Sequence, residues 1–282
     1  GSTKRPPDSI MQRLDVLLFD IQDVGLRYYT YLSSMHYLME ACAANGKRLI
    51  VLDRPNPNGF YVDGPVLEAK HRSFVGMHPI PVVHGMTLGE LARMIDGEGW
   101  LRDGLRCKLT VIPCRSYTHR SRYRLPTAPS PNLPNMRAVY LYPSLCFFEG
   151  TPISLGRGTD FPFQTYGHPK LQGDFSFTPR SNAGAKNPPL KDKLCHGVDL
   201  RTAPSDERIW ERGVDLGYVI DCYRQLNLGE KFFTPMFDRL TGTDYVRQMI
   251  LQGAGADRIK ARWADDVERF KQTRKPYLLY EE

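Results

Sequence analysis

Short apolar runs that end in polar side chains organise the first third of the chain. Residues 16–19 are all apolar, and Asp20, Gln22 and Asp23 follow them beside a glycine. A run this short, bounded by charge, predicts a central strand of a parallel sheet that is covered on both faces. Ligands of open α/β sheets bind outside the carboxyl ends of the strands. We therefore expect these three polar residues to face a binding site.

A helix and a second strand follow in the order of a βαβ unit. Residues 28–44 carry apolar side chains at helical spacing and close on an Asn-Gly pair, a common helix end. Residues 48–52 form a second apolar run, which leads into Asp53, Arg54 and a loop that contains Asn56. If the two strands are parallel, as the right-handed βαβ unit requires, their polar ends meet at one edge of the sheet.

A third unit ends in a loop histidine. The apolar residues 80–83 lead into His84. The sequence Thr-Leu-Gly-Glu at 87–90 matches a capping box, in which the Thr and Glu side chains bind reciprocal backbone amides. We therefore expect a helix that runs to about residue 97, with His84 just before it.

The second half is organised differently. A strand at 108–113 and a Pro-rich linker or cleft wall at 121–135 precede it. Two segments that mix glycine, apolar and charged residues, 142–151 and 156–160, are typical of loops close to a ligand. The last part predicts three helices and a final strand, at residues 214–226, 244–251, 256–273 and 277–280.

The composition is that of a globular protein with one large or two moderate domains. The chain has 282 residues, of which 41% are hydrophobic and 24% charged. No stretch approaches the ~20 apolar residues that cross a bilayer, so we expect no membrane span. The six cysteines form no C-x-x-C pair, which disfavours structural zinc. They could form disulfides, but we expect mostly free, buried thiols.

The net charge of +7 raises the question of an anionic partner. Lysine and arginine concentrate in residues 102–124, which form either a solvated loop or a surface that attracts a nucleic acid or an anionic glycan. No recognised DNA- or RNA-binding motif occurs, so we expect no nucleic-acid partner. The oligomeric state is left open by the sequence.

Motifs for cofactors are missing from the sequence. It contains no G-x-G-x-x-G after a strand, no P-loop and no G-x-S-x-G elbow, which disfavours nucleotide binding and serine hydrolase chemistry. A divalent cation held by Asp20, Asp23 and Asp53 is conceivable, because hard cations favour such oxygen clusters. Our prediction for the site is nevertheless no cofactor and no metal.

A series of motifs occurs in order along nearly the whole chain. They are FDIQDVG at 19–25 followed by Arg27, Tyr29 and Tyr31, LDRPNP at 52–57, HGMT at 84–87, PSPNLP at 129–134, EGT at 149–151, GRGT at 156–159 and YLLY at 277–280. In this order they resemble the motifs of the NamZ-type exo-β-N-acetylmuramidase family of glycoside hydrolases, formerly a domain of unknown function, DUF1343.

The resemblance implies both a fold and an activity. The fold is an α/β protein with a Rossmann-like, mainly parallel domain, which we place at 1–125, and a smaller α/β domain at 126–282, with a cleft between them. The activity is release of terminal N-acetylmuramic acid from the non-reducing end of peptidoglycan fragments, as in cell-wall recycling. It implies a muropeptide or disaccharide partner and a periplasmic or otherwise exported location. The alternative is an inactive protein of the same fold that binds peptidoglycan or another glycan.

The chain also departs from the family pattern. Members usually carry, upstream of the Asp-Ile-Gln-Asp strand, a Gly-Pro-Glu-His-Gly motif whose Glu is the favoured catalytic acid, and this motif does not occur here. Residues 1–6 resemble the family's loop just before that strand. We therefore expect that the first part of the domain, with the principal catalytic carboxylate, is absent from these 282 residues.

Glycoside hydrolysis normally uses two carboxyl groups that flank the scissile bond. We expect Asp20 or Asp23 to support the reacting centre and Glu149 to approach from the second domain. Each could equally be an acid that organises a loop. The distance between the carboxyl groups, and with it the retaining or inverting outcome, is not encoded in the sequence pattern.

Substrate contacts follow from the lactyl carboxylate of muramic acid. Arginine binds carboxylates at two points, and Arg27, Arg54 and Arg157 lie in suitable motifs, with a structural ion pair as the alternative for each. Tyr29 and Tyr31 could stack on a sugar or pack under the helix. The other expected sugar contacts are Gln22, Asp53, Asn56, His84, Asn132 and Thr159.

Overall fold

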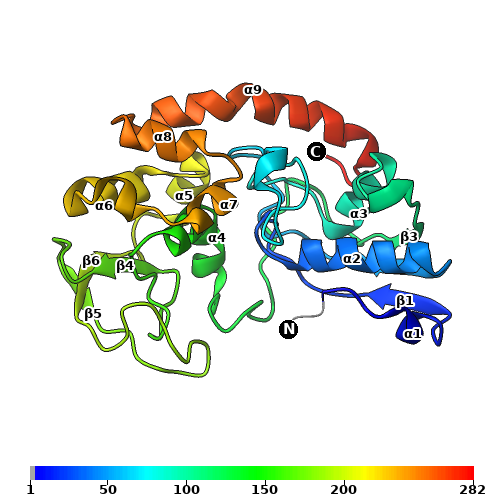
Figure 1. Ribbon diagram of the computed structural model, residues 1–282, viewed down its shortest axis with the longest axis horizontal. Coiled ribbons are helices and arrows are strands. Elements are labelled where there is room, and N and C mark those ends of the chain that lie inside the picture. Colours follow the sequence, from blue (N-terminus) through cyan, green and yellow to red (C-terminus); the bar gives the residue numbers. More distant parts are fainter. Residues whose placement is uncertain (1–3) are drawn as a thin grey trace.

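A parallel sheet forms the centre of the first half. The computed structural model describes residues 4–282, and strands β1 (Val16–Phe19), β2 (Arg48–Leu52) and β3 (Lys108–Ile112) lie in that spatial order. Helices α2 (Tyr31–Ala44) and α3 (Leu88–Gly97) cover one face (Figure 1), and the short α1 (Asp8–Met11) packs beside α2. The predicted βαβ unit and the strand at 108–113 are confirmed. The expectation for the start of the chain rests partly on residues 1–3, which lie outside the described residues.

The other face of this sheet is bare within residues 4–282. Val16, Leu18 and Ile112 point away from α2 and α3 and are 43, 61 and 48% exposed, whereas Phe19 and Val51 on the covered face are nearly buried. β1 is also an edge strand. The prediction of a central strand covered on both faces is therefore wrong for the described part of the chain. The apolar run correctly indicated two apolar faces, but only one of them is packed.

Local signals were accurate around α3. The Thr87 side chain accepts a hydrogen bond from the Glu90 amide, and the Glu90 carboxylate accepts one from the Thr87 amide, so the predicted capping box is confirmed. The preceding apolar residues form no regular strand, since Val83 makes only isolated bridges to Leu26 and Asp63. α2 begins at Tyr31, three residues later than the pattern predicted.

The second half combines a small antiparallel sheet with helices. Its strands, in the order β4-β6-β5, are β4 (Thr165–His168), β6 (Cys195–Asp199) and β5 (Phe175–Phe177). The helices of this half are α4 (Met136–Leu145), α5 (Asp206–Arg212), α6 (Gly217–Leu226), α7 (Pro235–Thr241) and α8 (Tyr245–Leu251). Helices close to those predicted at 214–226 and 244–251 are thus present.

Two segments differ from the prediction. Residues 142–151 are not an open loop, because α4 runs to Leu145 and the 3-10 helix η3 (Cys146–Gly150) continues it. Residues 277–280 are not a strand. The 3-10 helix η5 (Lys275–Tyr277) ends there, and an extended tail follows that binds side chains rather than a sheet. The remaining 3-10 helices are η1 (Ala69–His71), η2 (Arg102–Gly104) and η4 (Gly229–Phe232).

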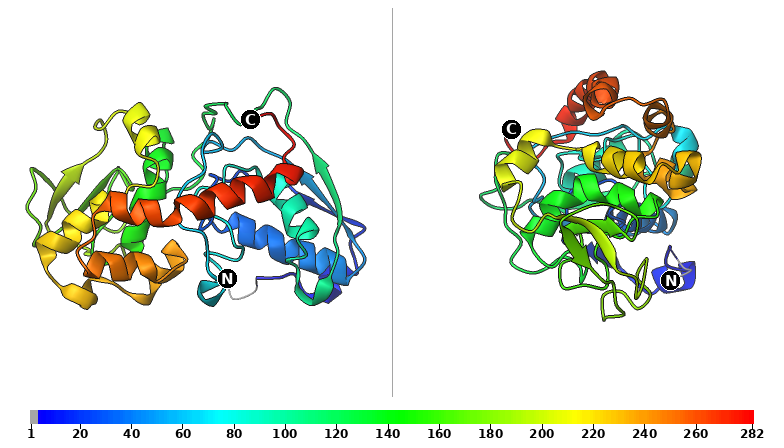
Figure 2. Two further views of the ribbon diagram at one scale, coloured as in Figure 1. Left: turned by 90° about the horizontal axis from the view of Figure 1, so that it is seen from above. Right: turned by 90° about the vertical axis from the view of Figure 1, so that its left-hand side faces the viewer.

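One long helix joins the halves. α9 (Ala256–Arg274), predicted at 256–273, lies across both of them (Figure 2). Trp263 is buried in the core of the second half and Phe270 in the core of the first. Trp263 also donates a 2.9 Å hydrogen bond to Asp63 in the loop after β2. The single helix is therefore a structural part of both cores.

The cysteines agree with the sequence analysis. All six are free, and all except Cys114 are buried. Among residues 4–282 there is no helix whose length and apolar character would suit a membrane crossing.

Candidate active site

A cavity of about 360 Å³ lies where the two halves meet. Tyr28 and Val75 come from the first half, and the other walls come mainly from α4, η3, α7 and the segment after η3. Its volume is at the lower end of the range of small-molecule sites. The lining is mostly apolar, with one acid and one guanidinium among it, Glu149 and Arg157.

Glu149 and Arg157 form an ion pair inside this cavity. Arg157 donates from Nε to Oε1 of Glu149 at 2.9 Å and a second time from Nη2 to the same oxygen. Both side chains are about one third exposed, at 32% for Glu149 and 27% for Arg157. The Arg157 guanidinium also lies 4.9 Å over the ring of Phe163. Two of the predicted site residues are thus brought together, oriented, and open to solvent.

Three cavity residues were missed by the sequence analysis. Tyr28 packs edge-to-face on Tyr142, and its hydroxyl donates to the Tyr142 and Pro143 carbonyls. The Cys146 sulfur lies 3.9 Å from Glu149 Oε2, and burial, together with the nearby Glu149, raises the pKa of this thiol well above its usual value. Positions 142, 146 and 149 have i, i+4 and i+7 spacing, which places them on one helical face. Reading this segment as a loop concealed that signal.

The acids after β1 and β2 gather at a second place, the carboxyl edge of the parallel sheet. Asp20 accepts a 2.6 Å hydrogen bond from Arg54, and this exposed pair bridges the two strand ends. Gln22 donates to the carbonyls of Asp23 and Pro55, which ties the same two loops together. The crevice at this edge is lined by Asp23, Arg54 and Asn56, with space for about one water.

Asp23 has the most unusual environment of the predicted acids. It is 7% exposed, Oδ1 accepts from the Gly25 amide at 2.7 Å, and Oδ2 is buried with no partner among residues 4–282. Burial raises the pKa of Asp23 to about 7, although the amides of Gly25, Val24 and Leu26 act in the opposite direction. A carboxyl group that keeps its proton near neutral pH has the property that a general acid needs.

The raised pKa of Asp23 predicts a stability change with pH. Between pH 3.8, the ordinary value, and about 7 the folded protein holds a proton that the unfolded chain releases, so stability falls as pH rises and levels off above pH 7. Asp23→Asn cannot ionise and is therefore expected to be about 2–4 kcal/mol more stable than the unmodified protein at pH 8, with little difference at pH 4. Urea unfolding at the two pH values measures this, and equal gains at both would contradict it.

The Asp53 carboxylate accepts hydrogen bonds from other parts of the protein. Its Oδ2 accepts from the hydroxyls of Thr87 and Tyr280, both at 2.6 Å, and its Oδ1 accepts from the Gly89 and Arg54 amides. Burial raises the pKa of Asp53, and these hydrogen bonds counteract the rise. The carboxylate thus caps α3 and anchors the C-terminal tail, which is the loop-organising alternative rather than a free sugar contact.

Two predicted substrate contacts are buried. Arg27 has no exposed surface, and it donates to the carbonyls of Pro65, Ile80, Leu240 and Thr241 at 2.6–2.8 Å. His84 is 1% exposed, its Nδ1 accepts from the Met86 amide, and burial, with Arg274 and Arg27 nearby, lowers its pKa to about 3. The structure corrects both expectations, since neither side chain reaches solvent. Arg27 joins the two halves, and His84 is a neutral core residue bonded to backbone.

The remaining predicted residues are scattered. Asn56 is buried, bonds to the Met86 carbonyl, and packs so closely on Gly25 (φ +81°) that a Cβ there would clash. Asn132 donates to the Gly184 carbonyl, and Thr159 donates to the Gly156 carbonyl, so both hold loops of the second half. Asp20, Asp23 and Asp53 do not converge on one point as a cation site would require. Asp20 binds Arg54, and Asp53 binds the hydroxyls of Thr87 and Tyr280.

Tyr29 lies between the cavity and the sheet edge. Tyr29 packs edge-to-face on Tyr31 and on the cavity residue Tyr142, with ring centroids 5.1 and 6.2 Å apart. Burial raises the pKa of Tyr29, and Tyr31 and Asp23 add to this effect. Tyr28, the neighbour that lines the cavity, precedes α2, which begins at Tyr31. The expected single cluster is thus two neighbouring places with Tyr29 between them.

Comparison with known proteins decides the family. A model of the N-terminal part of the exo-β-N-acetylmuramidase NamZ matches residues 1–137, and a model of its C-terminal part matches residues 140–280. The chain belongs to the NamZ family. This confirms the resemblance of the ordered motifs, and the NamZ architecture of two parts agrees with the α/β fold described above.

Relatives of known sequence and structure agree. The peptidoglycan β-N-acetylmuramidase NamZ of Bacillus subtilis (strain 168) is 36% identical over 305 residues, which cover 99% of this chain and 71% of the relative. Two DUF1343 family proteins from Bacteroides fragilis NCTC 9343 have similar crystal structures. One is 61% identical with a TM-score of 0.96, over 99% of this chain and 79% of its own. The other is 26% identical with a TM-score of 0.81, over 100% and 79%.

Proposed function

We propose that this protein is an exo-β-N-acetylmuramidase, which hydrolyses the bond to the terminal N-acetylmuramic acid at the non-reducing end of peptidoglycan fragments. The observation that carries the proposal, in a member of the NamZ family, is the cavity between the halves with Glu149 and Arg157 paired inside it. It offers an acid for the reacting carbon and a guanidinium for the lactyl carboxylate, with apolar and aromatic walls for the sugar ring.

The reaction needs a proton on the leaving oxygen and negative charge near the anomeric carbon. We assign the second task to Glu149, because its carboxylate is fixed by Arg157 and faces the cavity. Water supplies the hydroxyl that replaces the departing oxygen. The thiol of Cys146 is protonated and takes no part as a nucleophile.

Among the described acids, Asp23 is best suited to supply the proton. Its pKa of about 7 keeps a proton available at neutral pH. Asp23 lies at the sheet edge, in a crevice that now has space for about one water, and Tyr29 lies between that edge and the cavity. This assignment therefore requires the substrate to open the crevice and its leaving part to extend along Tyr29. Asp20 is paired with Arg54 on the surface and is the weaker candidate.

Hydrolysis of two 4-nitrophenyl glycosides tests the proposal. The protein is expected to release 4-nitrophenol from the β-N-acetylmuramide and much less from the β-N-acetylglucosaminide, which lacks the lactyl carboxylate. Arg157→Lys loses two-point binding and should raise KM for the muramide about 10-fold or more, with KM for the glucosaminide nearly unchanged. Equal effects on both substrates would contradict the role of Arg157, and the absence of turnover would contradict the proposed activity.

An inactive glycan-binding protein remains the second candidate. It would bind muramyl ligands in the same cavity without turnover, so the assay above separates it from the hydrolase. A periplasmic or otherwise exported location and a part in cell-wall recycling belong to the proposal too, because the proposed substrate is a cell-wall fragment. Fractionation of the cells that naturally produce the protein would test the location.

A further inference from the structure

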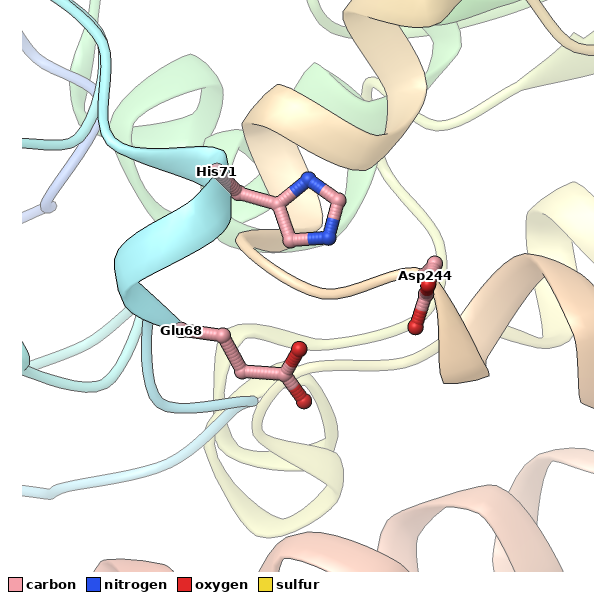
Figure 3. A group of neighbouring side chains, drawn as sticks. All are labelled: Glu68, His71 and Asp244. Atoms are coloured by element: carbon pink, nitrogen blue, oxygen red, sulfur yellow. The ribbon is translucent and has the colours of Figure 1, made fainter.

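Three potential metal ligands converge at the junction of the two halves, away from the candidate active site. Glu68 and His71 belong to the turn around η1, and Asp244 directly precedes α8 (Figure 3). One ligand atom from each lies within 4.8 Å of the other two. None of the three lines the cavity that contains Glu149.

The histidine in this group is unsatisfied. Nε2 of His71 is shielded from solvent and has no hydrogen-bond partner within residues 4–282, and Figure 3 shows the ring directed toward the space between the two carboxylates. A buried ring nitrogen without a partner carries a desolvation cost. This is an observation on the imidazole itself, independent of the clustering of the acids.

Within residues 4–282, the ion-pair partner that the two carboxylates share is an exposed lysine. Lys70 places Nζ 2.8 Å from Asp244 Oδ2 and 3.2 Å from Glu68 Oε2, and its side chain is 56% exposed. An exposed lysine pair of this kind contributes little to stability. The single ammonium offsets only one of the two negative charges and leaves the His71 nitrogen unpaired, whereas a divalent cation would match both charges and satisfy all three groups.

We propose that Glu68, His71 and Asp244 bind a divalent transition-metal ion of the Zn²⁺ type, which replaces the Lys70 ammonium. Imidazole together with carboxylate suits zinc, whereas Mg²⁺ and Ca²⁺ prefer oxygen ligands alone. Ligands at about 2.0–2.2 Å from one zinc ion lie roughly 3.4 Å apart, so these side chains must approach each other by roughly 1 Å. Their partial exposure permits this, with water completing the coordination.

The ion would fasten the two halves together. The Glu68 amide already donates to the Gly242 carbonyl at 2.9 Å, and Arg27 binds the carbonyls of Leu240 and Thr241 just before it. A cation shared by the η1 turn and the start of α8 would add a second cross-link beside these hydrogen bonds. Its expected role is stabilising rather than catalytic, and it does not depend on the proposed hydrolase activity.

Titration of the protein with divalent cations, after a chelator has removed any bound metal, tests the site. Zn²⁺ is expected to bind with 1:1 stoichiometry and to raise the unfolding temperature by roughly 5 °C at a 100-fold excess over Kd, while Mg²⁺ and Ca²⁺ at the same concentrations should not. No Zn²⁺ binding, or equal shifts with all three ions, would overturn the proposal.

Variants separate this site from adventitious binding. His71→Ala and Asp244→Asn are expected to weaken Zn²⁺ binding at least 10-fold, and Lys70→Met, which removes the competing ammonium, should strengthen it. His196→Ala is the matched control, because His196 lies in β6 and pairs with Ser176 far along the chain, and it should leave binding unchanged. Unaltered binding in His71→Ala, or weaker binding in Lys70→Met, would overturn the assignment. The Lys70 variant keeps the test valid even if a ligand variant fails to fold.

Discussion

Glu149→Gln is expected to lower kcat for the muramide about 1000-fold while the protein stays folded. The amide has nearly the shape of the carboxylate but no charge, so it cannot stabilise positive charge at the anomeric carbon or attack it. The lost ion pair with Arg157 is one third exposed, so its loss should cost less than about 1 kcal/mol of stability. Steady-state kinetics of 4-nitrophenol release, together with urea unfolding, measure both effects.

The matched control for this variant is Asp199→Asn. Asp199 is also a partly exposed carboxylate in an ion pair with an arginine, Arg201, but it lies in β6 outside the cavity. It should retain full activity. If Glu149→Gln stays within about threefold of the unmodified protein, Glu149 has no catalytic role and its pair with Arg157 is structural.

Arg27→Met is expected to produce the largest loss of stability, about 4–5 kcal/mol. The methionine fills much of the volume but leaves the carbonyls of Pro65, Ile80, Leu240 and Thr241 without their charged donor in a site closed to water. Burial lowers the pKa of Arg27 to about 10, so the guanidinium is still charged at neutral pH. Urea unfolding at pH 7 measures the loss.

Two further variants interpret that result. Arg27→Lys keeps a charge and three donors, so it should lose less than Arg27→Met. Arg208→Met removes an exposed arginine paired with Glu211 and should change stability by less than about 1 kcal/mol. A loss below about 1 kcal/mol for Arg27→Met would show that the four carbonyls do not depend on this side chain.

The sequence predicted the parts of the fold that depend on neighbouring residues. The capping box of Thr87 and Glu90, the apolar runs of β2 and β3, and the amphipathic pattern of α9 are local, so they could be read directly. The predicted final strand is wrong because the Tyr-Leu-Leu-Tyr tail does not join a sheet. The Leu279 amide instead donates a hydrogen bond to Glu90 of α3. That choice depends on contacts almost 190 residues apart in the chain.

The site was predicted less well, because a motif names residues and not the direction in which they point. Arg27 and Arg157 both lie in family motifs, yet one is enclosed by four carbonyls and the other opens into the cavity. Asp23 and Glu149 were expected to converge, and they lie in two neighbouring places instead. The burial that raises the pKa of Asp23 arises from packing between distant segments, which no spacing rule reveals.

The crossing of α9 limits how members of this family can be recombined. The two family models meet between residues 137 and 140, which suggests an obvious place to exchange one half for that of a relative. Yet Phe270 fills the core of the first half, Arg274 binds the carbonyls of His84 and Gly85, and Tyr280 binds Asp53. A hybrid gene joined at that point would therefore give the first half a foreign last helix and tail. A viable exchange therefore has to transfer residues 256–282 together with the first half, because these residues complete its core.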